Sequence, residues 1–391
     1  MPERPSWVTP SVVRGVRWGA VAAWAVTFVL DSYERGLHFD RTGLLFWFAL
    51  GLLAASIGKR RIWFVVVDFA PFAAVLVAYD LLRGAADTLG MPTWWQPQVD
   101  VDKFLFGGAE PTVWLQEHLK HRDVRWYDVV VCLCYISFFF LPYACAAVFW
   151  LRSRWEFYRW AIRFVALSFL GFALFALVPA APPWAAAKCM PNLVANHPSD
   201  PICLDYRSAA GVQNGGLLGS LHHVAPGANP YIERIAYRGF GELHLKAAGS
   251  LLQEGQGAVD QVAAVPSLHA AGTLLFVLFV WGRANRPWRA VLALYPPLMA
   301  FSLVYSAEHY VSDVLAGWLL ALLVHVGASR LERSARGQRW AKRLSGPDTL
   351  GSQPQPVPQS EPAVESQCLP IDPLPALPPF GLPPGMTPPS T

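Results

Sequence analysis

Charged residues are scarce in this chain of 391 residues. Asp, Glu, Lys and Arg make up 15% of it, against roughly 25% in an ordinary soluble domain. The net charge is only +4, so nothing points to a nucleic-acid partner. Six cysteines are too few for a disulfide scaffold. Residues 1–10 are polar and the apolar run after them lacks a small-residue cleavage site, so we expect no cleavable signal peptide.

Apolar residues are in excess instead. Hydrophobic residues make up 54% of the chain and the mean hydropathy is +0.31, which excludes a disordered chain and predicts a polytopic membrane protein. Eight apolar stretches occur, and only helices satisfy the backbone inside lipid. The stretches cover residues 13–30, 42–58, 63–82, 127–150, 161–179, 268–281, 291–305 and 310–328. We therefore predict an all-α, polytopic membrane helix bundle of about eight transmembrane helices. Because the last three stretches are shorter than about 20 residues, we expect their outer ends to be recessed in protein.

Basic residues set the expected orientation. Alternate short connections hold 18 of the 31 Lys and Arg residues, and the longer opposite loops hold 12. This alternation places both termini in the cytoplasm. The frequent Arg and Ala suggest a GC-rich genome, so we expect the plasma membrane of a bacterium.

The same pattern divides the chain into three regions. We predict an N-terminal transmembrane hairpin (1–60), a membrane domain (61–328) with external loops 83–126 and 180–265, and a cytoplasmic tail (329–391). The first loop is expected to hold a surface helix and the second to cap the bundle. The tail is basic and then Pro-rich, with 14 of the 34 prolines after residue 345, which predicts disorder.

Two features of the external loops bear on the outer surface. Cys189 and Cys203 share a loop on the oxidising side, where a bridge can form, but their spacing leaves the pairing open. Five tryptophans near this side predict an interfacial belt, with headgroup binding as the lesser alternative. They are Trp94, Trp95, Trp114, Trp126 and Trp184.

Two segments carry the residues suited to catalysis, at the outer ends of the sixth and eighth stretches. His309 and Asp313 are four apart, so on a helix the carboxylate can orient the imidazole as a nucleophile. His269 comes from a separate helix and suits a general acid. Ser267 can cap that helix or donate to a phosphate oxygen. Both histidines lie near expected helix N-termini, whose free N–H groups suit an anionic phosphate.

Other interpretations stay open from spacing alone. A histidine at a helix end is often only a cap, and two His with one Asp can form a metal triad. A transporter or scramblase without chemistry is a further alternative, since Asp68, Asp80 and Asp128 fall in apolar stretches.

A family resemblance narrows these alternatives. Ala-Val-Pro-Ser-Leu-His (264–269) with His-Tyr-Val-Ser-Asp (309–313) resembles the type 2 phosphatidic acid phosphatase superfamily. The chain looks most like the branch that contains inositol phosphorylceramide synthase. Weaker resemblance covers residues 102–107, 111–116 and 179–184, within a region of about 60–328.

The resemblance implies a catalytic set of His269, His309 and Asp313. The residue matching His309 forms a phosphohistidine, the one matching Asp313 orients it, and the one matching His269 protonates the leaving group. It implies no metal and no cofactor. We therefore expect an integral-membrane phosphotransferase, inositolphosphotransferase-like, whose external site takes a membrane lipid phosphate or phosphodiester and passes the group to a polyol or lipid alcohol. A lipid phosphate phosphatase that uses water is the alternative, and the oligomeric state stays open.

The phosphate-binding cations of the superfamily are not matched in this chain. Its upstream Ser-Arg pair corresponds here to Ser302 and Leu303, and its Lys-x6-Arg-Pro motif is absent. We predict that Ser267, Arg83 and Lys188 bind phosphate. Weaker candidates are Arg207, Arg234, Arg238 and Lys246.

Overall fold

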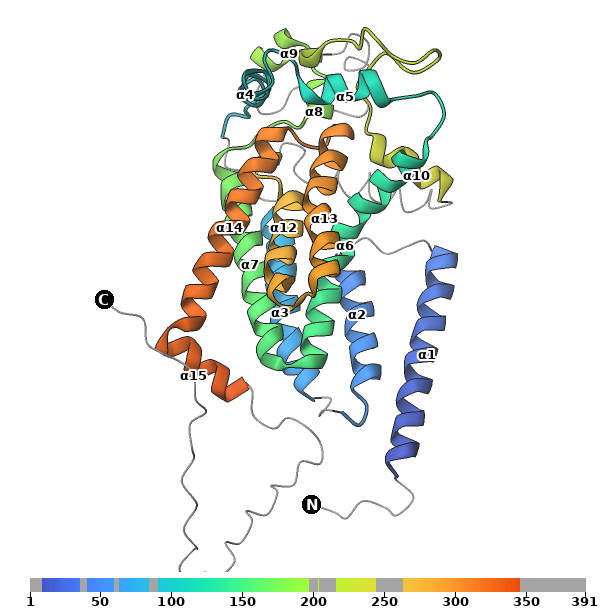
Figure 1. Cartoon of the computed structure of the whole chain (residues 1–391), viewed down its shortest axis with the longest axis vertical. Helices are drawn as coiled ribbons and strands as arrows, with labels where there is room; N and C mark the ends of the chain where they lie inside the picture. Colours follow the sequence, from blue (N-terminus) through green and yellow to red (C-terminus); the bar gives the residue numbers. More distant parts are fainter. Residues whose placement is uncertain are drawn as a thin grey trace, which may run out of the picture. The chain divides into compact units, whose positions relative to one another are not determined.

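The regular structure of the chain is helical (Figure 1). The computed structural model describes residues 9–35, 41–59, 63–83, 91–196, 203, 216–243 and 263–344. These residues form no β-strand; two isolated bridges join Trp94 to Ala180 and Ala180 to Ala263. The predicted all-α fold class is therefore confirmed.

Each of the eight apolar stretches falls on a helix. The helices are α1 (Pro10–Arg35), α2 (Arg41–Ser56), α3 (Trp63–Arg83), α6 (Trp126–Arg152), α7 (Arg154–Leu177), α12 (Leu268–Val280), α13 (Arg286–Tyr305) and α14 (Val311–Arg333). Five of them, α1, α6, α7, α13 and α14, are long and apolar enough to cross a membrane, and the other three are shorter apolar helices. The protein is an integral membrane helix bundle, and the count of eight spans stays a prediction.

The expectation that the last three helices are short holds for one of them. Helix α12 has 13 residues, whereas α13 has 20 and α14 has 23. Each longer helix includes basic residues at one end, Arg286 and Arg289 in α13 and Arg330 and Arg333 in α14. An apolar stretch therefore underestimates such a helix, because the backbone stays helical where the side chains become polar.

Carboxylates inside the bundle make structural contacts. Asp68 accepts hydrogen bonds of 2.7 Å from both Nε and Nη2 of Arg154, which joins α3 to α7. Asp128 accepts a 2.9 Å hydrogen bond from the Tyr305 hydroxyl, which joins α6 to α13. The side chain of Asp80 lies outside the described residues. Two of the three carboxylates that suggested a transport pathway thus hold helices together.

Short helices lie at the end of the bundle where α12 and α14 begin (Figure 1). They are α4 (Pro97–Leu105), α5 (Pro111–Leu119), α8 (Pro183–Ala186), α9 (Pro191–Asn196), the 3-10 turn η4 (Gly216–Leu218) and α10 (Ile235–Glu242). The first loop thus contains two helices where one was expected. Extended backbone ties this layer to the bundle: Ala181 N–H donates to the Trp94 carbonyl (2.9 Å) and Ala264 N–H to the Ala180 carbonyl (3.0 Å).

One amide side chain joins three separate regions at this end. Gln116 Nε2 in α5 donates to the carbonyls of Glu233 (2.7 Å) and Tyr305 (2.8 Å). Its Oε1 accepts from the Glu233 backbone N–H (2.9 Å). Lys120, next to this joint, has a fully buried side chain, and burial lowers its pKa to about 8. The 111–116 segment is therefore part of the frame that holds the layer on the bundle.

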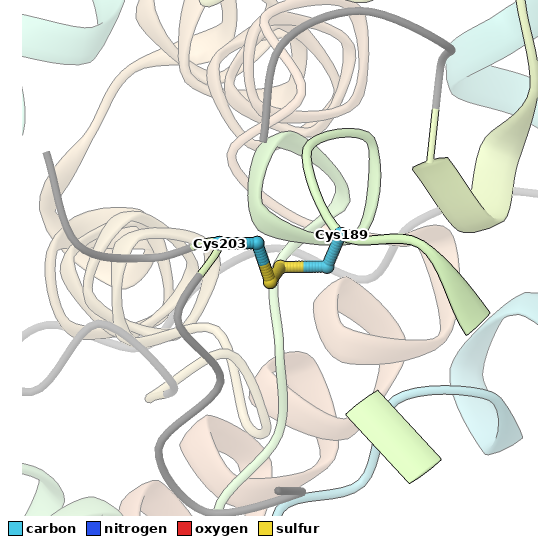
Figure 2. The surroundings of a disulfide bond; sticks show 2 residues. All are labelled: Cys189 and Cys203. Atoms are coloured by element: carbon cyan, nitrogen blue, oxygen red, sulfur yellow. A yellow bond between two sulfur atoms is a disulfide. The ribbon is translucent and has the colours of Figure 1, made fainter. Parts of the chain in front are cut away.

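Cys189 and Cys203 form a disulfide (Figure 2). The bridge belongs to a small buried cluster with Trp95, Ala181 and Val194, separate from the clusters formed by the long helices. Trp95 is only 5% exposed, so its assignment to an interfacial belt is wrong. The bridge therefore fastens the outer layer internally and leaves the long helices free of covalent ties.

Candidate functional site

The two segments selected from the sequence are in direct contact. Ser267 is the N-cap of α12, and its backbone N–H donates to the Asp313 carbonyl (3.0 Å). A Cβ on Gly317 would lie 2.3 Å from the Ser267 carbonyl oxygen. The glycine therefore permits a close approach of α14 to the start of α12, and this approach brings the segments together.

His309 and Asp313 are paired, but not across the face of a helix as expected. His309 precedes Tyr310, the N-cap of α14, and is therefore outside the helix. The Asp313 Oδ2 atom accepts from the Tyr310 N–H (2.9 Å) and lies 3.5 Å from His309 Nδ1. Asp313 is fully buried and His309 is 6% exposed. A turn at the helix start thus directs Nδ1 of the imidazole toward the carboxylate.

His269 is in the first turn of α12 and faces the same space. Its ring centroid lies 5.7 Å from that of His309. On the other side it stacks on Tyr135 (5.1 Å, 16°) and packs against Phe138 (4.1 Å). Both aromatic residues come from α6. The structure therefore brings together the two histidines that the sequence placed at one face of the membrane.

The backbone N–H groups at the start of α14 bind a carboxylate from another helix of the protein. Asp102 in α4 accepts from the N–H groups of Val311 (2.8 Å) and Ser312 (2.9 Å). Asp102 is fully buried, and burial raises its pKa, partly offset by these backbone hydrogen bonds. The idea that free N–H groups at this helix end bind a phosphate is therefore wrong, because Asp102 already fills that position. No local signal in the sequence links residues so far apart.

A largely buried ion pair involves Glu308, the residue before His309. Arg234, the N-cap of α10, donates to Glu308 through Nε (2.7 Å) and Nη2 (2.7 Å). The guanidinium lies 4.7 Å from the Trp184 ring centroid and 4.5 Å from that of Tyr237. The sequence ranks Arg234 among the weaker candidates, and the structure shows its guanidinium bound to the residue that precedes His309.

Lys188 belongs to the same group of residues. Its Nζ lies 5.1 Å from the Trp184 ring centroid. Desolvation and the positive charge of Arg234 lower the pKa of the Lys188 amine. The Trp184 backbone N–H donates to the Ala307 carbonyl (3.0 Å), so the 179–184 segment connects directly to the chain just before His309. Trp184 thus has two cations beside its ring and is hydrogen-bonded to the residue two positions before His309.

The other predicted phosphate ligands are a helix cap, an arginine that binds backbone carbonyls, and side chains outside the described residues. The Ser267 hydroxyl accepts from the Ala270 N–H (3.3 Å) and so caps α12. Arg238 donates to the carbonyls of His121 and Arg122 (both 2.7 Å), which is a structural contact. The side chain of Arg83 lies outside the described residues, as do Arg207 and Lys246. In the part of the chain that the structure describes, no group of three His, Cys, Asp or Glu side chains could hold a metal ion.

Comparisons with known proteins give one family and one relative. The family model described as "PAP2 superfamily" matches residues 99–327. Phosphoinositol dihydroceramide synthase of Bacteroides thetaiotaomicron is 26% identical over 284 residues, which is 70% of this chain and 79% of the relative. No solved structure matches the chain. The matched region spans α4 to α14 and so includes every residue described at the site.

Proposed function

The chain belongs to the PAP2 superfamily, and from this premise we propose that it transfers a phosphoryl-type group from a lipid phosphodiester to an alcohol. The family and the relative together support a membrane enzyme that modifies lipid phosphates. The observation that carries the finer proposal is the pair of imidazoles, 5.7 Å apart on separate segments, with Asp313 behind one of them.

In the proposed first step, His309 is the nucleophile. Its Nδ1 faces Asp313, so Nε2 attacks phosphorus, an N–P bond forms and the bond from phosphorus to the leaving alcohol breaks. His269 gives its proton to the departing oxygen. Asp313 keeps the Nδ1 tautomer and stabilises the positive charge on the ring.

In the second step the acceptor resolves the phosphohistidine. An alcohol hydroxyl gives its proton to His269, its oxygen bonds to phosphorus and the N–P bond breaks. Both histidines return to their starting states, so no metal or cofactor enters this scheme. The name of the relative, a synthase, supports an alcohol over water as acceptor.

Arg234, Lys188 and the Ser267 hydroxyl are the proposed phosphate ligands. Arg234 is fixed beside His309 by Glu308 and two aromatic rings, and Lys188 shares the Trp184 ring with it. The Ser267 oxygen accepts from a backbone N–H, which leaves its proton for a phosphate oxygen. The two cations and the hydroxyl would together bind the phosphate in place of the superfamily motifs that this chain lacks.

The transferred group is proposed to be phosphoinositol and the acceptor a ceramide-like alcohol. The support is the name of the relative, a phosphoinositol dihydroceramide synthase. Purified protein is incubated with labelled phosphatidylinositol, with and without dihydroceramide, and the products are separated. We expect labelled phosphoinositol dihydroceramide. Release of inositol phosphate at an equal rate in both samples would instead identify a hydrolase, and no product would reject the proposed reaction.

Variants of the three residues test their roles. His309→Ala should abolish turnover and any acid-labile phosphoenzyme, and Asp313→Asn should lower activity by orders of magnitude. His269→Ala should retain more activity on aryl phosphates than on lipid substrates, because general acid help is worth about a hundred- to ten-thousand-fold for a poor leaving group. His118→Ala is the matched control, since His118 is exposed and stacks on Trp114. Equal loss on both substrates would show that His269 is not the acid.

The site is further proposed to face the outside of the cell, with both termini cytoplasmic. The basic-residue distribution supports this, as does the Cys189–Cys203 bridge in the layer over the site. One new cysteine at a time replaces His223 or Gly282, in a Cys368→Ser background whose other free thiols, Cys132, Cys134 and Cys145, are buried, and it is labelled with an impermeant maleimide. Label at 223 in intact cells and at 282 only after permeabilisation is expected, and the reverse pattern would invert the topology.

A further inference from the structure

The short helix α15 (Ala335–Leu344) follows α14 at the end opposite the candidate site. At 100° per residue its side chains separate into two groups. The group on one side is Gly337, Trp340, Ala341 and Leu344. The group on the other side is Arg336, Arg339, Lys342 and Arg343. The helix is therefore amphipathic, with four positive charges and no acidic residue.

The basic side chains of α15 are not neutralised by nearby carboxylates. All four basic residues are exposed. The carboxylates at this end of the bundle are already paired: Glu332 with Arg159 and Arg163, and Glu156 with Arg159 and Arg283. Among the described residues, no carboxylate forms an ion pair with the four basic side chains of α15. The charge is thus available to an anionic partner.

The backbone turns sharply between α14 and α15. Ser334 is extended (φ −68°, ψ 159°), and its hydroxyl and carbonyl accept from the N–H groups of Gly337 (3.2 Å) and Gln338 (3.0 Å). A Cβ on Gly337 would lie 2.4 Å from the Leu331 carbonyl oxygen. The turn therefore requires a residue without a side chain here, and α15 runs across the end of α14 (Figure 1).

We propose that α15 lies along the surface of the nearer membrane leaflet and binds anionic phospholipid headgroups. A helix that crosses the axis of a transmembrane helix at its end runs near the plane of the membrane. Trp340 is 53% exposed, and an indole of this kind belongs at the boundary between headgroups and acyl chains. The long basic side chains extend from the opposite face to the phosphates. Charge complementarity thus selects anionic lipid as the occupant.

The test measures lipid contact and not turnover, so it is independent of the proposed reaction. One new cysteine at a time replaces Ala341 on the apolar side or Gln338 on the polar side, in a Cys368→Ser background whose other free thiols are buried. Each carries an environment-sensitive fluorophore, and the protein is reconstituted in nanodiscs. The discs contain phosphatidylcholine alone or an equimolar mixture with phosphatidylglycerol. Aqueous iodide and nitroxide-labelled lipid then report which label is in water and which is in lipid.

In the mixed discs we expect the label at 341 to be shielded from iodide and quenched by the nitroxide lipid, while the label at 338 stays accessible to iodide. Changing Arg336, Arg339, Lys342 and Arg343 to Gln should release the helix, with about a fivefold loss of the binding constant for each charge. The matched control changes the three arginines to Lys, keeps the charge and should keep the shielding. Iodide access at 341 that is equal in both discs, or shielding that survives the Gln changes, would overturn the proposal.

Discussion

Asp102 provides the sharpest test of how the site is held together. Its buried carboxylate accepts two backbone hydrogen bonds at the start of α14, two and three residues after His309. Asp102→Ala would leave two partly buried N–H groups without this acceptor, at up to about 1–3 kcal/mol each. Asp102→Asn keeps one acceptor oxygen and should lose about half as much. The cost of burying the carboxylate, which raises its pKa, offsets part of each loss.

The catalytic consequence should exceed the loss of stability. If the start of α14 moves by about 1 Å, His309 is misplaced by a similar amount, and such a shift can cost about a hundredfold in rate. We therefore expect Asp102→Asn to unfold at a slightly lower temperature in detergent. Its kcat should fall by about ten- to a hundredfold, with little change in KM.

Asp100 on the same helix is the matched control. It is exposed, and its side chain accepts a hydrogen bond from Gln96 (2.9 Å). Asp100→Asn should match the wild type in both thermal unfolding and turnover. Wild-type kcat in folded Asp102→Asn, or an equal loss of kcat in Asp100→Asn, would refute the reasoning that Asp102 positions the nucleophile segment.

Three further predictions concern the outer layer and the turn between α13 and α14. Burial raises the pKa of Glu110 to about 7 from 4.5, so its stabilising contribution is full below about pH 4.5 and is lost as the pH rises through about 7. Glu110→Gln still accepts from the Val113 N–H. It should remove about 3 kcal/mol from the fall in the free energy of unfolding between pH ~4 and pH ~8. If the pH dependence of unfolding is the same in the variant and the wild type, this prediction is wrong. Reducing the Cys189–Cys203 bridge, or changing both residues to Ser, should cost about 3 kcal/mol of stability without altering the spectroscopic helix content, and an unchanged melting temperature would count against it. Ala307 has a φ of 60°, so Ala307→Gly should raise stability by about 1 kcal/mol; a lower melting temperature would show that the Ala methyl group outweighs the backbone strain.

The helices were predictable because lipid imposes a simple requirement on sequence. Every apolar stretch became a helix, and the two histidine segments start α12 and α14 at the same end of the bundle. The apolar stretches and the alternation of basic residues were enough for this, since the backbone has no alternative to a helix in a membrane. Lengths were harder to predict, because α13 and α14 include residues whose side chains are basic.

The partners of the site could not be predicted, because they depend on tertiary contacts. Asp102 and Val311 are 209 residues apart, and Arg234 and Glu308 are 74 apart. Nothing in the local sequence distinguishes Arg234, which pairs with Glu308 next to His309 in the chain, from Arg238, which binds backbone carbonyls. The position of His309 outside α14 likewise depends on the turn made by Asp313. Residue types and spacing indicate the chemistry of the site, while the packing of the loops determines which cation lies close enough to bind phosphate.

The Gln116 joint has a consequence for biosynthesis. The amide bonds to the carbonyl of Tyr305, which is synthesised 189 residues later. At about 5–20 residues per second, the ribosome needs roughly 10–40 s to reach that partner. During this interval α5 and the segment around Glu233 lack their final contact with α13. The outer layer can therefore complete its contact with α13 only after nearly the whole bundle has been synthesised, so its final packing is one of the last steps in folding.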